Sequence, residues 1–499
     1  MKKNTFLFLV FIGLFSIACT QKTGNKKMVL YPVSTDPTIS FRILFRTGSQ
    51  DDPAGKEGLA ALTAAMISRG STKKHSYEQL LELLYPMAAS ISSQVDKEMS
   101  VFSGRIHKDN LNDYFDLFKE VLLEPAFTEN DFNRIKSNFI NNIQKNVRYA
   151  DDEELGKEVL SEFIFSGTPY GHLEEGHVSS LRSITLDDVK AFYRDHYTRA
   201  ALLIGLGGGY PADFPATVKA AFDALPEGTA SQTAISRPAA IDGLQVEIVE
   251  KKVPATAISF GFPIDITRRD KDFYALALAT SWLGEHRNSS SHLYQVIREK
   301  RGLNYGDYAY IEHFPNGGRR QFPPANVARR QQIFQIWIRP VPNNARLFAF
   351  RAALRELRKL VDNGLSKEEF ELTRNFLTNY IAHYAPTTFQ KLGYALDDVF
   401  YGINGHYLDN FPRMMKKLTL NDVNRAIKKH LQYQNIKAVF ITGDAEQLKD
   451  ALVNNSPSPI EYSTPKSKAI LREDKEIASY PLKVPAENIK IVPVDKVFE

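Results

Sequence analysis

Two histidines with two glutamates between them form the densest group of potential metal ligands in this sequence. His172, Glu174, Glu175 and His177 follow a Pro-Tyr-Gly turn. A spacing of five residues places the two imidazoles on different sides of a helix, so a surface loop is the favoured interpretation and a metal site the alternative. The spacings that put two imidazoles one helical turn apart, His-x-x-Glu-His and His-Glu-x-x-His, do not occur in the chain. The sequence therefore predicts no metal bound by this chain.

An arginine and a tyrosine seven positions apart are the second candidate pair. Arg298 and Tyr305 begin and end the run Arg-Glu-Lys-Arg-Gly-Leu-Asn-Tyr. Arginine is a planar donor that is always charged, and tyrosine is a neutral phenol that can donate a hydrogen bond at pH 7. From the spacing alone, the favoured interpretation is that Arg298 is a solvated charge on an amphipathic helix and Tyr305 lies in a strand core.

Arginine and proline are concentrated between two expected strands. The stretch 317–330 begins Gly-Gly-Arg-Arg-Gln-Phe-Pro-Pro and ends with Arg329 and Arg330. This composition predicts a loop that contacts a partner or an acidic substrate, and a merely solvated loop is the equal alternative.

The single cysteine, Cys19, lies where a processing enzyme would use it. Two lysines precede an apolar stretch at 6–17, which is too short to span a bilayer, and small residues come just before the cysteine. This pattern predicts a lipoprotein signal peptide at 1–18, lipidation of Cys19 and a polar tether at 19–29, with a short membrane helix as the alternative. The expected location is the cell envelope of a Gram-negative bacterium, lipid-anchored at the periplasmic face of the outer membrane.

Composition excludes several classes of protein. The chain has 499 residues, of which 43% are hydrophobic and 24% charged, so it can bury several cores and is too apolar to be disordered as a whole. Its 63 basic and 58 acidic residues nearly cancel to a formal charge of +5, which argues against a nucleic-acid partner held by phosphate contacts. One cysteine cannot form an internal disulfide.

Two alternating patterns predict the elements that must position these residues. Short β-branched and aromatic runs predict strands at 39–45, 99–106, 201–206, 244–249, 257–262, 333–338 and 437–442. Stretches with a 3.6-residue period predict helices at 56–70, 76–87, 108–122, 128–150, 151–165, 185–197, 271–285, 289–300, 345–363, 366–384 and 419–433. The fold class is therefore α+β with a predominance of helix.

Two elements of the first half recur in the same order in the second half. The segment 184–189 returns at 418–423, an offset of 234 residues (418 minus 184), and 128–132 returns at 366–370, an offset of 238 (366 minus 128). The recurrence indicates a duplicated unit of roughly 200 residues. We expect a first domain at 30–228, a linker at 229–241, a second domain at 242–454 and an extended tail at 455–499, lying over the surface or partly mobile.

One stretch of the first half resembles a known signature. Residues 46–60, Arg-Thr-Gly-Ser-Gln-Asp-Asp-Pro-Ala-Gly-Lys-Glu-Gly-Leu-Ala, followed by Arg-Gly-Ser at 69–71, are similar to the first-domain signature of the insulinase family of zinc peptidases, which includes pitrilysin and mitochondrial processing peptidase. The resemblance extends over about residues 30 to 450. It implies two homologous domains, each an antiparallel sheet backed by helices, and assembly into chambers of four such domains.

The same resemblance shows where this chain departs from the active members. Those enzymes carry His-x-x-Glu-His after Gly-Leu-Ala, with two zinc ligands and a general base. Here Ala61 and Ala65 replace the histidines, Ala64 replaces the base, and Asn142 aligns with the glutamate that is the third ligand. The resemblance therefore implies that this chain neither binds zinc nor activates a water.

The element around Arg298 and Tyr305 resembles a second-domain element that faces the zinc site in the family. On that match Arg298 would hold a peptide carbonyl and Tyr305 would donate to the developing oxyanion. We therefore expect a non-catalytic subunit of a heterodimeric or larger peptidase, whose partner supplies His-x-x-Glu-His and zinc for cleaving a peptide substrate. The alternatives are a stand-alone peptide-binding or scaffold lipoprotein and, less favoured, an active enzyme with displaced ligands.

Overall fold

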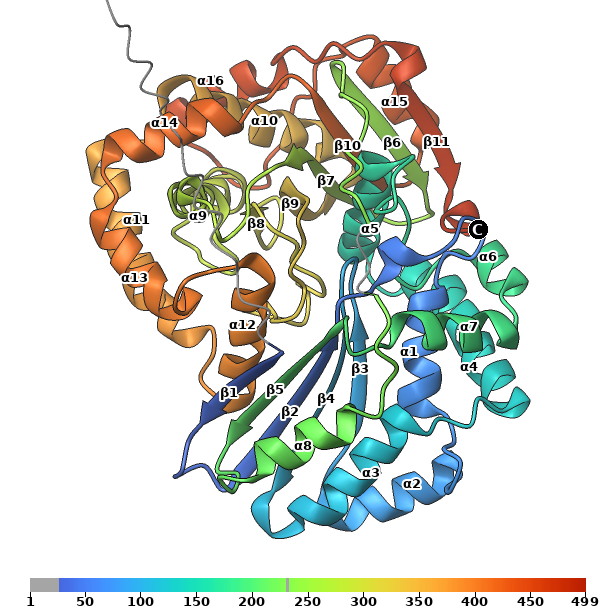
Figure 1. Ribbon diagram of the computed structural model, residues 1–499. Coiled ribbons are helices and arrows are strands. Elements are labelled where there is room, and N and C mark those ends of the chain that lie inside the picture. Colours follow the sequence, from blue (N-terminus) through green and yellow to red (C-terminus); the bar gives the residue numbers. More distant parts are fainter. Residues whose placement is uncertain (1–26, 230–232) are drawn as a thin grey trace, which may run out of the picture.

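The computed structural model describes residues 27–229 and 233–499, which form two sheets surrounded by helices (Figure 1). The predicted signal peptide, Cys19, most of the predicted tether and part of the predicted linker lie outside these described residues. Within them, every helix is too short or too polar to span a bilayer.

Each half of the chain builds one sheet. The first sheet has the strand order β1-β5-β2-β4-β3 and the second has β11-β6-β10-β7-β9-β8. The strands of the first sheet are β1 (Met28–Pro32), β2 (Thr38–Phe45), β3 (Ile91–Val95), β4 (Ser100–His107) and β5 (Leu202–Gly208). Those of the second are β6 (Leu244–Glu250), β7 (Ala255–Ile264), β8 (Asp307–Tyr310), β9 (Gln332–Pro342), β10 (Ile436–Thr442) and β11 (Ile489–Pro493).

Helices surround both sheets, and many begin with a hydroxyl side chain that caps the free backbone N–H groups, as Thr185 and Thr419 do. The first half contributes α1 (Leu59–Arg69), α2 (Tyr77–Leu84), α3 (Leu111–Leu123), α4 (Glu129–Asn141), α5 (Asp152–Phe165), α6 (Val178–Ser183), α7 (Leu186–His196) and α8 (Phe214–Phe222). The second half contributes α9 (Lys271–Gly284), α10 (Arg346–Asn363), α11 (Lys367–Tyr380), α12 (Thr388–Tyr401), α13 (Tyr407–Lys417), α14 (Leu420–His430), α15 (Ala445–Val453) and α16 (Lys468–Ala478). Two further segments, Asn142–Val147 and Tyr294–Glu299, are π-helical.

The duplication expected from the sequence is visible in the topology. Strands β1 to β5 occupy the same order in the first sheet as β6 to β10 in the second, with β11 added at one edge. The central pairs β2–β4, β2–β5, β7–β9 and β7–β10 are antiparallel, whereas β1 and β6 pair in parallel with their neighbours β5 and β10. The α+β class with two homologous domains is therefore confirmed.

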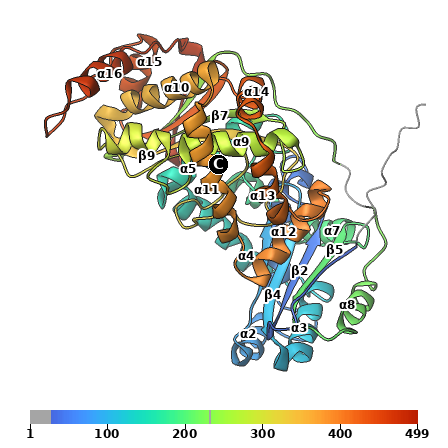
Figure 2. The ribbon, with the colours of Figure 1, turned by 90° about the vertical axis from the view of Figure 1, so that its left-hand side faces the viewer.

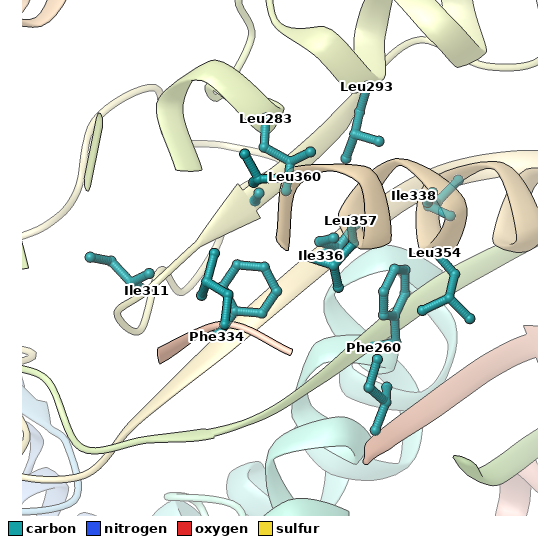
Figure 3. Close-up of a cluster of buried hydrophobic side chains, with 14 of the residues drawn as sticks. Phe260, Leu283, Leu293, Ile311, Phe334, Ile336, Ile338, Leu354, Leu357 and Leu360 are labelled. Carbon is teal, nitrogen blue, oxygen red and sulfur yellow. The ribbon is translucent and has the colours of Figure 1, made fainter. Parts of the chain in front are cut away.

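Side chains alternate between the two faces of each strand, and this alternation builds the cores. On β9, Phe334, Ile336 and Ile338 are buried in the core of the second half, where Figure 3 shows them beside Leu354 and Leu357 of α10. Burying side chains of this kind is worth about 1.5–3 kcal/mol each relative to exposure.

The two halves exchange one helix each, as Figures 1 and 2 show. Helix α5 of the first half packs on β7, β9 and β10 of the second sheet, and α12 of the second half packs on β1, β2 and β5 of the first. The strands therefore serve two cores: on β10, Ala438 and Phe440 belong to the core of the second half, whereas Val439 and Ile441 belong to that of the first. The two domains share packed surfaces rather than touching only at their edges.

The expectation of an extended tail at 455–499 is wrong. Helix α16 packs on α10, and β11 pairs in parallel with β6. Ion pairs from Arg301 to Glu473 and Asp474, both at 2.8 Å, attach α16 to the domain. The segment 468–478 does carry an amphipathic helical period, but it is short and stands between prolines and lysines that obscure it.

Candidate functional site

The positions that would carry the zinc motif lie on α1. This helix begins after Gly58, whose φ of 97° lies in the left-handed region, and the carboxylate of Asp52 accepts hydrogen bonds from the N–H groups of Gly58 and Ala60, both at 2.7 Å. The three alanines that replace the motif are buried on this helix, Ala61 and Ala65 almost completely and Ala64 completely. A methyl group has no atom that binds a metal or accepts a proton, so these residues do not fit a zinc ion.

Asn142, the fourth expected position, is already engaged. Its Nδ2 donates to Oε2 of Glu175 at 2.6 Å, and its Oδ1 accepts from Nδ2 of Asn146 at 2.8 Å. The loop that carries Glu175 also closes on the start of α1, because a Cβ at Gly58 would lie 2.4 Å from the Glu175 carbonyl oxygen. Glu175 thus contacts Asn142 through its side chain and the start of α1 through its backbone.

The surface loop expected at 172–177 is instead largely buried. His172 is buried, with Nδ1 2.9 Å from the Leu173 carbonyl oxygen and Nε2 3.1 Å from that of Ser49, and burial together with the charge of Lys97 lowers its pKa to about 4. The ring centroids of His172 and His177 are 6.5 Å apart, and Nε2 of His177 is 3.0 Å from Oε2 of Glu162. No three His, Cys, Asp or Glu side chains of the described residues are placed to hold a metal ion.

A cavity of about 540 Å³ lies between the two halves, next to Asn142. Its walls come from the first half and from the loop at 313–327 of the second half. Burial raises the pKa of Glu158 above its usual range, and the negative charges of Glu174 and Glu154 raise it further. The acidic residues that line this cavity are Asp96, Asp151, Glu154, Glu158, Glu174 and Glu175.

Buried ion pairs tie the loop from the second half to the first. Arg329, only 2% exposed, donates to both carboxylate oxygens of Asp96 at 2.5 and 3.1 Å and to Glu174 at 2.8 Å, and Lys97 lies 3.0 Å from Glu174. Burial disfavours the charged form of Glu174, yet Lys97 and Arg329 outweigh it and hold the pKa of Glu174 below its usual range. For Arg329, the prediction of a solvated or partner-binding loop is therefore wrong, because its charge is satisfied inside the molecule.

Arg298 and Tyr305 do meet in the structure. The guanidinium carbon of Arg298, on the π-helical segment, lies 5.3 Å from the centroid of the Tyr305 ring, a cation–π distance. Tyr305 is 77% exposed, which rules out a place in a strand core, and the buried Nε of Arg298 has no hydrogen-bond partner among the described residues. Neither residue lines the cavity beside Asn142. The pair lies just before the edge strand β8 and is open to solvent.

Sequence reasoning missed the charged residues between the halves. Asp96, Lys97 and Glu98 form a short turn between β3 and β4, where a run of charges normally indicates a solvated hairpin. Their partners Arg329 and Arg330 lie more than 200 residues away, with Arg330 paired to Glu98. Only the three-dimensional structure brings these residues together.

The fold and the altered α1 define a class: two-domain proteins of the peptidase M16 fold. A model described as Insulinase (Peptidase family M16) matches residues 27–173, and a model described as Peptidase M16 inactive domain matches residues 183–377. The chain belongs to this family.

Named relatives and solved structures agree with this assignment. The chain is 22% identical over 449 residues to "Non-peptidase homolog YmxG" of Helicobacter pylori, covering 88% of this chain and 97% of that protein. It is 23% identical over 250 residues to "Probable mitochondrial-processing peptidase subunit beta, mitochondrial" of Arabidopsis thaliana, covering 50% of this chain and 46% of that protein. A crystal structure of a peptidase M16 inactive domain from Pseudomonas fluorescens has a TM-score of 0.73 at 24% identity, covering 85% of this chain and 96% of that one. The structural likeness shows the fold.

Proposed function

We propose that this chain is the non-catalytic subunit of a heteromeric insulinase-type peptidase. In this proposal a partner chain carries His-x-x-Glu-His, zinc and the general base, while this chain contributes Arg298, Tyr305 and part of the chamber wall. Relatives named as a processing-peptidase subunit and as "Cytochrome b-c1 complex subunit 1, mitochondrial" of Caenorhabditis elegans support a place in an assembly.

One observation carries the proposal: the metal positions have lost their functional side chains, whereas the Arg298–Tyr305 pair has kept them. Buried methyl groups occupy α1 where ligands would be, yet the half-buried Arg298 and the exposed Tyr305 both keep side chains that can bind a peptide. Because the pair does not line the cavity at the altered metal positions, a reacting group beside it would have to come from another chain. A buried Nε without a partner is a further sign that Arg298 lacks a ligand.

The two side chains suit complementary tasks. Arg298 is a permanent cation whose planar donors can hold a peptide carbonyl, both in the bound substrate and in the transition state. Tyr305 can donate its phenolic proton to the oxygen on which negative charge develops. In the family resemblance these are the roles of the matching residues, and the cation–π contact would keep the pair together.

A second candidate function is a stand-alone peptide-binding or scaffold lipoprotein. The relative named a non-peptidase homologue favours it, as does a cavity between the domains whose described side chains are not placed to hold a metal ion. In either case we propose that lipid on Cys19 holds the chain at the periplasmic face of the outer membrane.

The test is reconstitution with an insulinase-type chain that carries His-x-x-Glu-His, first sought in the neighbouring reading frame. The mature chain alone should cleave no peptide and retain less than about 0.1 zinc per chain after dialysis. In the pair, Tyr305→Phe should lower kcat by roughly 10- to 1000-fold with little change in KM, because it removes one donor that acts mainly in the transition state. Arg298→Ala should also raise KM.

The matched control is Tyr85→Phe, because Tyr85 is 86% exposed on the first half and has no role in the proposal. It should leave both kinetic constants unchanged. Full activity of a normally assembled Tyr305→Phe or Arg298→Ala complex would show that the pair has no catalytic role and would favour the scaffold function.

A further inference from the structure

A second, larger cavity of about 820 Å³ borders the first one. The two share Gln94, Arg320 and Pro324, so they form neighbouring parts of one hollow between the halves. The walls of the second cavity are the face of β3 and β4 that points away from the core of the first half, the loop at 320–325 and the first turn of α12. We refer to this cavity as the arginine groove.

Charge distinguishes the arginine groove from its neighbour. Three arginines line it, Arg42, Arg105 and Arg320, and its lining includes no aspartate or glutamate. None of these three guanidinium groups forms an ion pair within 4 Å with a carboxylate of residues 27–229 or 233–499. The first cavity, by contrast, is lined by six acidic residues. Asp397 and Asp36 act on Arg42 and Arg105 only at longer range, so the lining itself carries positive charge. Like charges that line a hollow concentrate the potential inside it and attract the opposite charge.

The strand register places polar side chains in a row across the floor of the groove. Arg42 of β2 is opposite Ser103 of β4, and Ser103 is opposite Ser92 of β3. On this face, the neighbouring part of the sheet is apolar where α12 covers it, with Leu44 and Leu203 buried against Leu392. The face thus changes from apolar to basic and hydroxyl-rich where the helix begins.

Arg42 is held in a fixed position at one end of this row. It is only 7% exposed, its Nε donates to the Phe389 carbonyl oxygen at 3.1 Å, and its Nη1 donates to Oδ1 of Asn326 at 2.6 Å. Its guanidinium lies 3.9 Å from the centroid of the Phe389 ring. Burial lowers the pKa of Arg42 to about 10, which still leaves it charged at neutral pH. Its Nη2 forms no hydrogen bond with the described residues and remains available to a ligand.

Helix α12 adds to the same potential. Its N-cap residue Thr387 and the first-turn residues Phe389 and Gln390 line the groove, so the positive end of a 14-residue helix lies at its wall. The remaining wall carries aromatic and proline side chains, among them Phe322 and Tyr384. A volume of about 820 Å³ with one aromatic and proline-rich side fits a chain of several residues better than a small ion.

We propose that the arginine groove binds an acidic peptide segment, whose carboxylates pair with Arg42, Arg105 and Arg320. The hydroxyls of the floor bond to the peptide backbone, and the aromatic wall contacts its side chains. The site belongs to this chain alone and requires neither a partner nor zinc, so it goes beyond the proposed function and does not depend on it.

The experiment measures binding of fluorescent decapeptides to the mature chain alone by anisotropy, in about 50 mM salt. One peptide contains four glutamates among serines and glycines, and its matched counterpart has four glutamines instead. The glutamate peptide should bind at least about tenfold more tightly, since several charge-assisted contacts are lost in the counterpart.

Two neighbouring arginines supply matched variants. Arg320→Gln should weaken binding of the glutamate peptide by about 5- to 10-fold, as should Arg105→Gln. Arg319→Gln removes the same charge from the next residue, but Arg319 lines only the first of the two cavities, so affinity should change less than about twofold. All three side chains are exposed, and the variants are expected to fold.

Three results would overturn the proposal. Equal affinity for the glutamate and glutamine peptides would show that carboxylates are not recognised. Equal effects of Arg319→Gln and Arg320→Gln would show attraction to the surface charge in general. If inorganic phosphate displaced the fluorescent peptide at the same concentration as unlabelled glutamate peptide does, the groove would be a general anion site.

Discussion

Removing Arg329 should destabilise the protein more than any change at an exposed arginine of the same loop. Arg329→Ala leaves the Asp96 carboxylate buried without the two hydrogen bonds from Arg329, so that it keeps the bond from the Lys97 N–H at 2.7 Å but loses its countercharge. Glu174 keeps Lys97 at 3.0 Å. Breaking a buried ion pair by removing one partner costs about 3–5 kcal/mol, and because Lys97 still neutralises Glu174 we expect about 3 kcal/mol, the lower end. That is a large share of a typical free energy of unfolding of about 5–15 kcal/mol.

Urea denaturation at pH 7, followed by far-UV circular dichroism, measures this loss. The control is Arg319→Ala, which removes an exposed arginine and should change the free energy of unfolding by less than about 0.5 kcal/mol. In Arg329→Ala/Asp96→Asn the buried charge is gone as well, so the double variant should lose less stability than the sum of the two single variants. A free energy of unfolding for Arg329→Ala equal to that of Arg319→Ala would refute the reasoning.

Two further predictions concern the half-buried Glu285 and the contact of α5 with the second sheet. Burial raises the pKa of Glu285 to about 7 from 4.5, so the unfolded chain loses this proton first and stability falls as pH rises from about 4.5 to about 7. Glu285→Gln should escape that loss, so its free energy of unfolding in urea should exceed that of the wild type by roughly 3 kcal/mol at pH 8 and by little at pH 4. A difference that does not change with pH would contradict this explanation. Gly156→Leu should cost about 1–3 kcal/mol, because a Cβ there would lie 3.2 Å from Oγ of Ser259 and 3.5 Å from Cγ1 of Ile441. An unchanged or raised melting temperature would contradict close packing of α5 on the second sheet.

The central part of the fold was predictable because its strands are buried on both faces and read as continuous apolar runs. Every strand and helix expected from the sequence is present, with ends shifted by a few residues. The strands β1, β3, β8 and β11 were missed because they lie toward the edges of their sheets, where polar residues and short lengths weaken the pattern. Helix α12 was missed although it covers the first sheet, since Pro386 precedes it closely and Gly393 interrupts its period.

The candidate site was predictable only where a local motif carries it. The altered positions on α1 and the pair Arg298 and Tyr305 stand in short runs that can be compared with a family signature. Their roles in a partner's reaction remain predictions. The arginine groove and the ion pairs of Arg329 join residues far apart in the sequence, such as Arg42 and Asn326, and no local pattern contains such a pairing.

The exchange of helices means that α5 is synthesised well before all the strands that cover it. Helix α5 ends at Phe165, but the strand β10 that covers its second face ends at Thr442, which is 277 residues later (442 minus 165). At a synthesis rate of about 5–20 residues per second, α5 waits roughly 14 to 55 seconds for the last of the strands that pack on it. During that time the first half is a nascent chain with an uncovered hydrophobic surface. A chaperone over this surface, or a chain that stays unfolded until its second half has emerged, would protect it from aggregation.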